Sequence, residues 1–89
     1  MSKKLKMYTI YDKKAGVCWQ PFFVEHEIQA KRQFARLVSD DDSHVKTYPE
    51  DFRMLKLGEF DQETGEVTGE IEIDLEATDI ARYMNQEVK

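Results

Sequence analysis

Polar and apolar residues alternate over two neighbouring segments near the start of the chain. Over residues 4–12 the alternation predicts a strand with two different faces, one formed by Leu5, Met7, Thr9 and Tyr11 and the other by Lys6, Tyr8, Ile10 and Asp12. Residues 13–16 predict a turn, because Gly16 can adopt a positive φ. Residues 17–24 predict a returning strand, in which Pro21 indicates an edge or a bulge because it cannot donate a ladder hydrogen bond.

The spacing of apolar residues changes to that of a helix after Glu25. Positions i, i+4, i+7 and i+8 predict one buried stripe, formed by Ala30, Phe34, Leu37 and Val38. Three basic residues lie off this stripe and are expected to face solvent or a ligand, namely Lys31, Arg32 and Arg36. The helix is expected to end in a polar loop at residues 39–43, and Pro49 favours an extended backbone at Tyr48.

The second half of the chain predicts two more strands and a second helix. Residues 52–60 have apolar side chains on both faces, which indicates a central strand that is covered on both sides. A hairpin loop at residues 61–65 leads into a weaker strand within residues 66–74, which contains Gly69. Asp74 is then expected to cap a last helix, whose apolar stripe is Ala77, Ile80, Ala81 and Met84.

Together these elements predict a single α+β domain over residues 1–89. The expected order is ββαββα, with a small antiparallel sheet of three to four strands, one main helix packed on it and a C-terminal helix. A chain of 89 residues has room for one modest core, and domains of this size often gain stability by self-association. Neither an apolar segment of signal-peptide length nor a stretch long enough to span a membrane occurs, so a soluble intracellular protein is expected.

The formal net charge of −5 conceals opposite charges in the two halves of the chain. Residues 1–38 carry eight basic and three acidic side chains, whereas residues 39–89 carry five basic and fifteen acidic ones. The first half therefore has a charge of +5 and the second a charge of −10. Such a split suggests a basic surface for a polyanion together with an acidic segment. The alternative, which the charges alone favour, is that two solvated faces attract each other within the fold.

Candidate catalytic and metal-binding residues are few. Cys18 is the only cysteine, so neither an intramolecular disulfide nor a four-cysteine zinc site can form, which favours a reducing compartment. It lies beside Trp19 in an apolar strand, where a buried thiol is expected, and nothing in its spacing to His26 or His44 supports a catalytic pair. The acidic run at residues 40–42 lacks the glycine and glutamate of a calcium loop. Since no phosphate-binding, dinucleotide or metalloprotease motif occurs either, we predict a protein that is not an enzyme and has no cofactor.

Aromatic and basic residues are interleaved in the first half of the chain. A sheet face that carries rings beside lysines can stack bases and neutralise phosphates, as single-strand-binding proteins do. The candidate nucleic-acid-binding residues are Lys4, Lys6, Tyr8, Tyr11, Lys13, Lys14, Trp19, Lys31, Arg32 and Arg36. The alternative, favoured by the residues alone, is that the rings form the core, because so small a domain has few other large apolar residues to bury. The two interpretations can hold together, because Tyr8 and Tyr11 lie on opposite faces of the predicted strand.

Several short motifs, in a fixed order, are similar to those of one viral protein family. They are an early strand followed by Gln20-Pro21-Phe22-Phe23, the helix pattern Ala30-x-Arg32-x-Phe34, the segment Tyr48-Pro49-Glu50-Asp51-Phe52, and Leu57-Gly58-x-Phe60-Asp61 with Thr64-Gly65. Over residues 5–67 the chain thus resembles the small nonstructural protein of gokushoviruses, which are single-stranded DNA phages of the Microviridae. The stretch after Val67 carries no matching motif.

The resemblance implies a protein that is made in the cytoplasm of the infected bacterium and is absent from the mature capsid. It implies a role in single-stranded genome synthesis or packaging, with DNA as a ligand, and it supplies no catalytic residues. Arg32, within the helix motif, is the candidate for a shared functional charge, whereas residues 49–52 are expected to have a structural role.

Two functional hypotheses follow. The first is an accessory protein that binds single-stranded DNA through its basic, aromatic first half, which requires the acidic half to point away from DNA or to contact a basic partner. Such a partner is expected among phage or host replication or capsid proteins. The second is a dimeric protein-interaction or scaffolding module without nucleic-acid contact, because the small core and an exposed sheet edge favour pairing with another copy. Neither hypothesis involves a membrane.

Overall fold

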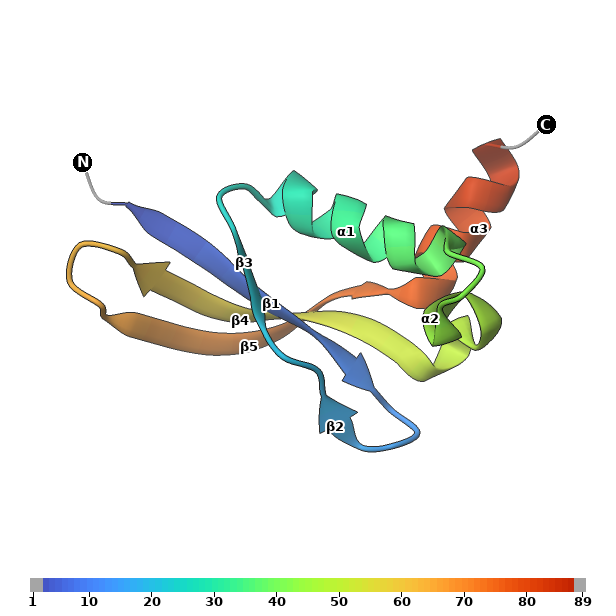
Figure 1. Ribbon diagram of the computed structural model, residues 1–89, viewed down its shortest axis with the longest axis horizontal. Coiled ribbons are helices and arrows are strands. Elements are labelled where there is room, and N and C mark those ends of the chain that lie inside the picture. Colours follow the sequence, from blue (N-terminus) through green and yellow to red (C-terminus); the bar gives the residue numbers. More distant parts are fainter. Residues whose placement is uncertain (1–2, 88–89) are drawn as a thin grey trace.

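One antiparallel sheet, with helices on one of its sides, makes up the fold (Figure 1). The computed structural model describes residues 3–87, and the side chains of residues 3–82. The elements are β1 (Lys4–Asp12), β2 (Val17–Cys18), β3 (Phe22–Val24), α1 (Glu27–Ser39), α2 (His44–Thr47), the 3-10 helix η1 (Pro49–Asp51), β4 (Phe52–Asp61), β5 (Val67–Glu76) and α3 (Ala77–Glu87). The predicted α+β class, main helix and C-terminal helix are confirmed.

The sheet has five strands because the predicted second strand is divided in two. Both β2 and β3 pair with the same edge of β1, and the rest of the sheet follows in the order β1-β4-β5. Between them the Trp19 amide donates to the Ile10 carbonyl at 2.9 Å, and the Thr9 hydroxyl donates to the Trp19 carbonyl at 2.7 Å. Pro21 follows in this irregular segment, which agrees with the prediction of an edge or a bulge. Cys18, expected to be buried, is exposed because β2 lies at the edge of the sheet.

The central strands β1 and β4 place their most buried apolar side chains toward α1. Tyr8 pairs with Lys56 and Ile10 pairs with Met54, and directly opposite residues share a face of the sheet. Ala30, Phe34 and Val38 of α1 are buried, as their spacing predicts, whereas the fourth predicted member, Leu37, is half-buried. The even-numbered face of β1 is therefore the core face.

The strand β4 is central, as predicted, but it is covered on one side. Within the described part of the chain, α1 and α3 lie on the same side of the sheet and no helix lies on the other (Figure 1). On that second face Ile71 and Ile73 of the neighbouring β5 remain 73% and 58% exposed. The prediction of a strand covered on both faces is thus wrong for this chain taken alone.

Two short elements in the connection from α1 to β4 are not anticipated by the sequence patterns. The Ser43 hydroxyl accepts from the Val45 amide at 3.0 Å and begins α2, while Val45 itself is fully buried. Tyr48 has φ −129° and ψ 62°, so its backbone turns into η1 and is not simply extended. The long-range burial of Val45 stabilises a turn that its polar neighbours do not predict.

The start of α3 also differs from the prediction. Asp74 lies inside β5, which continues to Glu76, and so it does not cap the helix that begins at Ala77. Ala77 and Ile80 are buried as their spacing predicts, and Ala81 packs at the margin of the core. The predicted fourth residue of this stripe, Met84, has a side chain outside the described ones.

Asp74 instead occupies a β-bulge, because Met54 pairs with Leu75 whereas Leu55 pairs with Ile73. Its Oδ2 atom is buried without a hydrogen-bond partner among the described residues, as is the Tyr8 hydroxyl. Burial raises the pKa of Asp74, against the opposing charge of Lys31. Burial, and next the charge of Asp74, raise the pKa of Tyr8 to about 12.

The Asp74→Asn variant is expected to be more stable at neutral pH by about 1 kcal/mol, because an amide is less costly to bury than a carboxylate without a partner. A carboxyl whose folded pKa is raised binds a proton more tightly in the folded state, so its protonation favours folding. The cost of Asp74 therefore grows as pH rises through its folded pKa and vanishes below its unfolded pKa. Urea unfolding at neutral and mildly acidic pH should show the advantage of Asp74→Asn shrinking with acidification, and an advantage that is the same at both would contradict this account.

Candidate nucleic-acid interface

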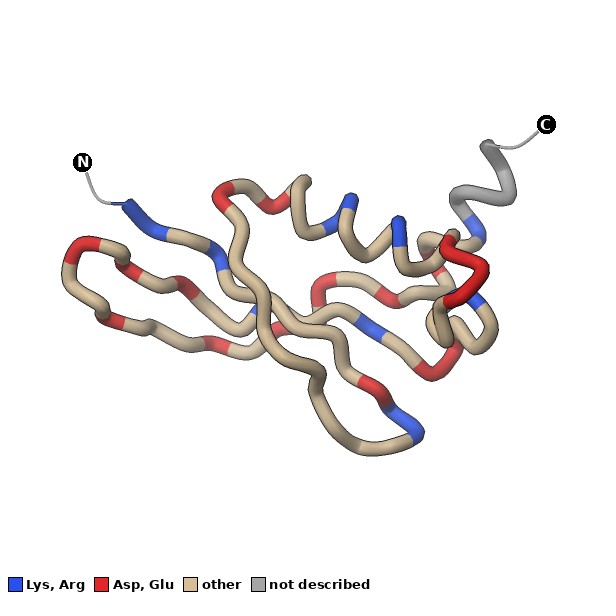
Figure 2. The backbone as a smooth tube through the Cα atoms, in the orientation of Figure 1, with Lys and Arg blue, Asp and Glu red and all other residues tan. Residues whose placement is uncertain are grey.

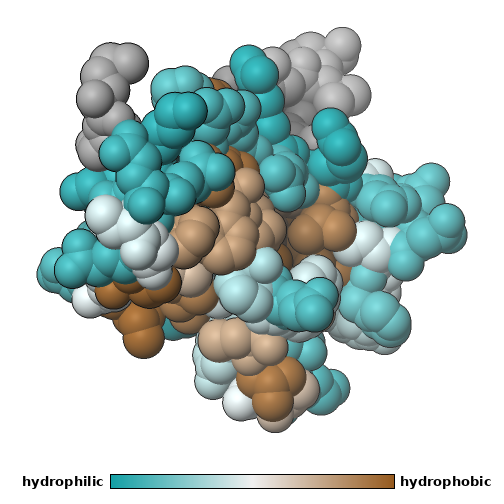
Figure 3. All heavy atoms as spheres, turned by 60° about the vertical axis from the view of Figure 1, so that its left-hand side comes forward, coloured by the Kyte–Doolittle hydropathy of each residue, from teal (hydrophilic) through white to brown (hydrophobic). Residues whose placement is uncertain are grey.

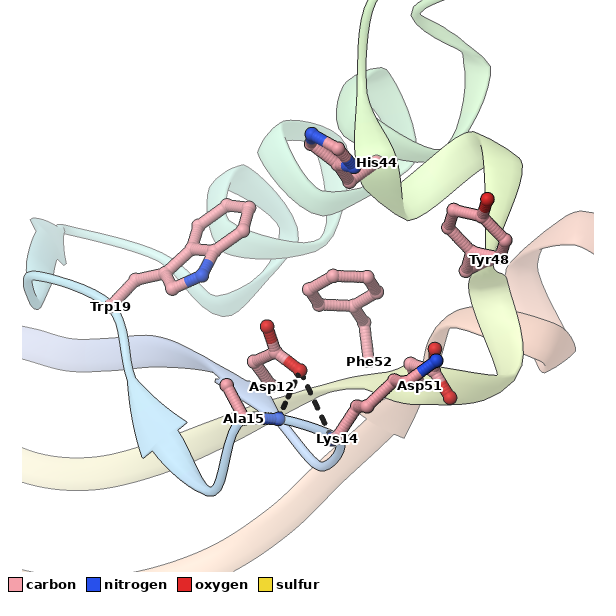
Figure 4. A pocket seen from close by; sticks show the side chains of 8 residues that line it. All are labelled: Asp12, Lys14, Ala15, Trp19, His44, Tyr48, Asp51 and Phe52. Carbon is pink, nitrogen blue, oxygen red and sulfur yellow. Dashed lines mark hydrogen bonds between the residues drawn. The ribbon is translucent and has the colours of Figure 1, made fainter.

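A hollow of about 540 Å³ opens between the β1–β2 turn and the α2–η1 segment (Figure 4). It is lined by Asp12, Lys14, Ala15, Trp19, His44, Tyr48, Asp51 and Phe52. One hydrogen bond joins its two sides, since the Lys13 amide donates to the Asp51 carbonyl at 2.8 Å. Two segments that are distant in sequence thus form one concave site.

The β1–β2 turn holds the basic rim of this hollow. The Asp12 carboxylate accepts hydrogen bonds from the Lys14 and Ala15 amides, each at 3.0 Å, as the dashed lines in Figure 4 show. Gly16 closes the turn with φ 72°. The amides of the turn thus hold the Asp12 carboxylate in place, whereas the exposed Lys14 ammonium makes no ion pair among the described residues.

Aromatic rings surround the rest of the hollow. Trp19 leaves the sheet where β2 ends and packs edge-on against Phe52, with ring centroids 5.7 Å apart and planes at 64°. Tyr48 and His44 come from the opposite side, where the Tyr48 amide donates to the His44 carbonyl at 2.8 Å (Figure 4). Trp19 is 38% exposed and Tyr48 is 50% exposed, so both offer ring surface to a flat ligand.

A second hollow, of about 460 Å³, shares Trp19 with the first and lies between the β2–β3 connection and α1. Arg36 lines it together with Gln20 and Gln33. Arg32 lies one helical turn before Arg36 on α1 and is exposed, but it lines another hollow, together with Asp79 and Ile80 of α3. The two hollows that share Trp19 form a path from the β1–β2 turn to Arg36 on α1, with Arg32 one helical turn further on.

Three of the ten predicted site residues line the two hollows of this path, namely Lys14, Trp19 and Arg36, and a fourth, Arg32, lies one helical turn from Arg36. Lys4 and Lys6 lie toward the far end of β1, about 26 Å and about 20 Å along the strand from Asp12 at the turn. Tyr8 is fully buried and stacks on Phe22, so its ring is not available to a base. Tyr11 lies on the opposite face of the sheet, paired with Cys18.

The remaining two predicted residues, like Lys6, form ion pairs within the chain. Lys13 contacts Glu76 at 3.0 Å, Lys31 contacts Glu27 at 2.9 Å, and Lys6 approaches Glu59 at 3.8 Å. The pairs of Lys6 and Lys13 join the basic half to the acidic half, as the interpretation of mutually attracting faces expects. All three pairs are partly exposed, so each contributes little to stability.

Most acidic positions lie away from the path, although Asp12 and Asp51 line the first hollow and Asp40 lines the second. In Figure 2 acidic positions crowd the β4–β5 hairpin, whereas basic positions lie on α1 and at the β1–β2 turn. A second acidic group, residues 40–42, directly follows α1, and there Asp41 pairs with Lys46. The outer side of α1 is therefore locally basic in a chain of net charge −5.

His44, Tyr48 and Phe52 are the site residues that sequence reasoning missed. They follow Trp19 by at least 25 positions, and only the pairing of β1 with β4 brings them beside it. Within residues 3–82 no three His, Cys, Asp or Glu side chains are arranged to hold a metal ion. No helix in the described range is long and apolar enough to cross a membrane.

Comparison with known proteins gives one match. The model of a family described as the phage ORF5 protein matches residues 5–80 of the chain. No curated protein matches, and no solved structure matches.

Proposed function

Because the chain belongs to the phage ORF5 protein family, we propose that it is a phage accessory protein that binds single-stranded DNA during genome synthesis or packaging. The proposal includes the gokushovirus setting that the sequence motifs suggest, a nonstructural protein acting in the cytoplasm of the host bacterium. The observation that carries it is the aromatic hollow between Trp19 and Tyr48, with Lys14 on its rim.

A nucleobase is the ligand that suits this hollow. Bases stack on exposed aromatic rings whatever their sequence, and each such contact contributes about 1–3 kcal/mol. Trp19 and Tyr48 supply ring faces, and the Asp51 carboxylate can accept from an N–H group on the edge of a base, such as the N3–H of thymine. The acidic lining disfavours a phosphate inside the hollow, so the base enters it and the backbone stays outside.

The backbone of such a strand would follow the basic residues of the path. Lys14, Arg36 and Arg32 can each neutralise one phosphate, while the neighbouring base occupies the second hollow beside Trp19. With about three phosphates contacted, the logarithm of the binding constant should fall with the logarithm of salt concentration with a slope of about −2. The acidic β4–β5 hairpin lies away from this path (Figure 2).

The single tryptophan of the chain offers a direct test. Adding an unlabelled oligothymidylate at low salt should quench Trp19 fluorescence, because a stacked base contacts the indole. Fluorescence anisotropy of a labelled oligonucleotide should show that Trp19→Ala weakens binding about tenfold. Val17→Ala is the matched control, since Val17 is 54% exposed on the adjoining strand but does not line the hollow.

A second pair of variants tests whether phosphates bind along the basic residues of the path. Lys14→Glu should weaken binding more than Lys4→Glu, although both change the net charge equally and both side chains are exposed. Equal losses would indicate a diffuse charge effect without a defined path. No anisotropy change at about 100 µM protein in low salt, a range that detects even nonspecific DNA binding, would contradict the whole proposal.

A second candidate function is supported by the exposed acidic β4–β5 hairpin. Glu63, Glu66 and Glu70 are exposed there and form no ion pair among the described residues. A protein-interaction module would use this hairpin to contact a basic surface of a replication or capsid protein. Affinity capture from infected cells tests this function. If the wild-type chain captures such a protein, and a chain with these three glutamates changed to Gln does not, this function is favoured over DNA binding.

A further inference from the structure

The face of the sheet opposite α1 is apolar across all of its long strands. Residues that pair directly lie on the same face, which places Leu55 with Ile73, Phe60 with Val67, and Phe23 with Met7. The Phe23 and Phe60 rings contact each other edge-on, with centroids 5.8 Å apart, and so join β3 to β4 on this face. These residues form a continuous surface, which we call the open face.

The residue pattern of β5 shows which of its sides is apolar. Val67, Ile71 and Ile73 point to the open face, whereas Thr68 and Glu72 point to the side on which α1 lies. A strand that met only α1 and solvent would have the opposite pattern, with its aliphatic residues toward the helix. The alternation in β5 therefore matches a protein in which the open face is buried.

The exposure of these side chains is high for apolar residues. Ile71 is 73% exposed, Val67 and Ile73 are each 58% exposed, and Phe23 is 45% exposed. The space-filling view of Figure 3 shows one side of the molecule, on which hydrophobic residues reach the surface over the middle and lower part, bordered by hydrophilic ones. A contiguous apolar surface of this kind on a small domain marks an interaction site.

We infer that the open face is the interface of a homodimer, in which the sheets of two copies pack face to face. The sheet is four strands wide, with about 4.8 Å between neighbouring strands, and about ten residues long, so one of its faces has an area of about 600 Å². Two copies packed face to face would therefore bury about 1,200 Å² in total. This reaches the lower limit for specific, stable protein interfaces. A two-fold axis brings the same apolar surface from each side, and two twisted sheets stack in this way about 10 Å apart.

The apolar make-up of the open face supports a second copy as the occupant. At the end of the face that holds Arg53, the Glu76 carboxylate binds Arg53 at 3.1 Å and Lys13 at 3.0 Å within the same chain. The charged groups of this margin are therefore held by ion pairs within one chain, with one positive charge in excess. The apolar side chains themselves are matched by another apolar face, whereas a nucleic acid would leave them in contact with phosphate and water.

Face-to-face packing also explains self-association better than pairing along a sheet edge. The edge formed by β2 and β3 has only two and three residues in its strands, and the segment with Pro21 interrupts it. The other edge, β5, is ten residues long, but its register against β4 shifts at two bulges. Short or bulged edges are poor templates for a further strand. The inference does not depend on DNA binding, because the aromatic hollow lies at the β1–β2 turn and not on the open face.

Sedimentation velocity of the full chain tests the interface. The wild type should sediment as a dimer, and Ile71→Asp combined with Ile73→Asp should sediment as a monomer with an unchanged far-UV circular dichroism spectrum, because neither side chain is in the core. Ile28→Asp is the matched control, since Ile28 is 53% exposed on α1, and this variant should remain a dimer. If the double variant fails to fold, Ile71→Thr serves as the test, because threonine also favours strands. This variant should raise the dissociation constant of the dimer at least about tenfold.

Three results would overturn the inference. The first is a wild-type chain that sediments as a monomer at the highest attainable concentration. The second is a dimer that survives in the folded Ile71 and Ile73 variants, which would place the contact at a strand edge or on a helix. The third is a loss of the dimer in Ile28→Asp equal to that in the open-face variant.

Discussion

Replacing Gly58 with alanine is expected to lower the free energy of unfolding by at least about 3 kcal/mol. Gly58 has φ 144°, a conformation that residues with a side chain rarely adopt. An added Cβ would also collide with the backbone of the neighbouring strand β5, at the Thr68 carbonyl oxygen and 2.8 Å from the Gly69 Cα atom. Backbone on both sides cannot move away without separating the two strands.

The effect should be large because Gly58 lies where two irregular pairings meet. The register of β1 against β4 shifts between Met7 and Tyr8, and that of β4 against β5 shifts between Lys56 and Gly58. Against β1 the additional residue is Leu57 of β4, whereas against β5 the additional residue belongs to β5, where Glu70 and Ile71 lie opposite Leu57. A substitution that disturbs this bulge therefore affects the whole central part of the sheet, including the side chains of the open face.

Gly69→Ala is the matched control for this prediction. Gly69 pairs with Gly58 across the same two strands, but its added Cβ would meet the Leu57 carbonyl oxygen at an ordinary 3.4 Å. Urea denaturation should show a much smaller change for Gly69→Ala than for Gly58→Ala. Similar losses in both variants would show that glycine is needed there for some reason other than the bulge.

The sequence predicts the elements whose signals are local. The stripe of α1, the turn at Gly16 and the interruption at Pro21 each follow from the conformational preferences of a few adjacent residues. The bulge at Gly58 does not, because its glycine is required by a contact with Thr68 of another strand. In the same way, the assignment of Asp74 as a helix cap failed because pairing with β4 extends β5 beyond it.

The candidate site was predicted only in part, for a related reason. The interleaving of rings and lysines along β1 indicates which residues are available, but it does not show which face the helix will cover. Tyr8 is buried by α1 and Tyr11 is not, although both lie in one strand. His44 and Tyr48 reach Trp19 only because β4 pairs with β1, and a single sequence carries no direct signal for that proximity.

Some charges of the basic half pair with the acidic half in the fold, and others remain unpaired among the described residues. Glu59 and Glu76 of the acidic half bind Lys6 and Lys13 of the basic half, which accounts for part of the asymmetry. Arg32 and Arg36 are exposed on α1 and form no ion pair among the described residues. Within the described residues, the charges of the basic half left for a polyanion are therefore the arginines of α1 and Lys14, together with Lys3 and Lys4 at the far end of β1.

Replacing Phe34 with alanine is expected to destabilise the domain by about 3–5 kcal/mol. Phe34 is fully buried at the centre of α1 and belongs to the same core as Ile10 and Met54 of the central strands. Domains of this size have a total stability of about 5–10 kcal/mol, so the variant would lose a large part of it. Ile28→Ala is the control on the same helix, because Ile28 is 53% exposed and its loss should cost less than about 0.5 kcal/mol.

Thermal unfolding at several protein concentrations would connect this prediction to the proposed dimer. If two copies bind through the open face, dissociation accompanies unfolding, and the melting temperature of Phe34→Ala should rise with protein concentration. The folded fraction of this variant should then also fall when Ile71→Asp is added, although Ile71 lies outside the core. A Phe34→Ala variant as stable as Ile28→Ala would contradict the position of α1 on the sheet. A melting temperature independent of concentration would leave α1 in place and contradict the dimer.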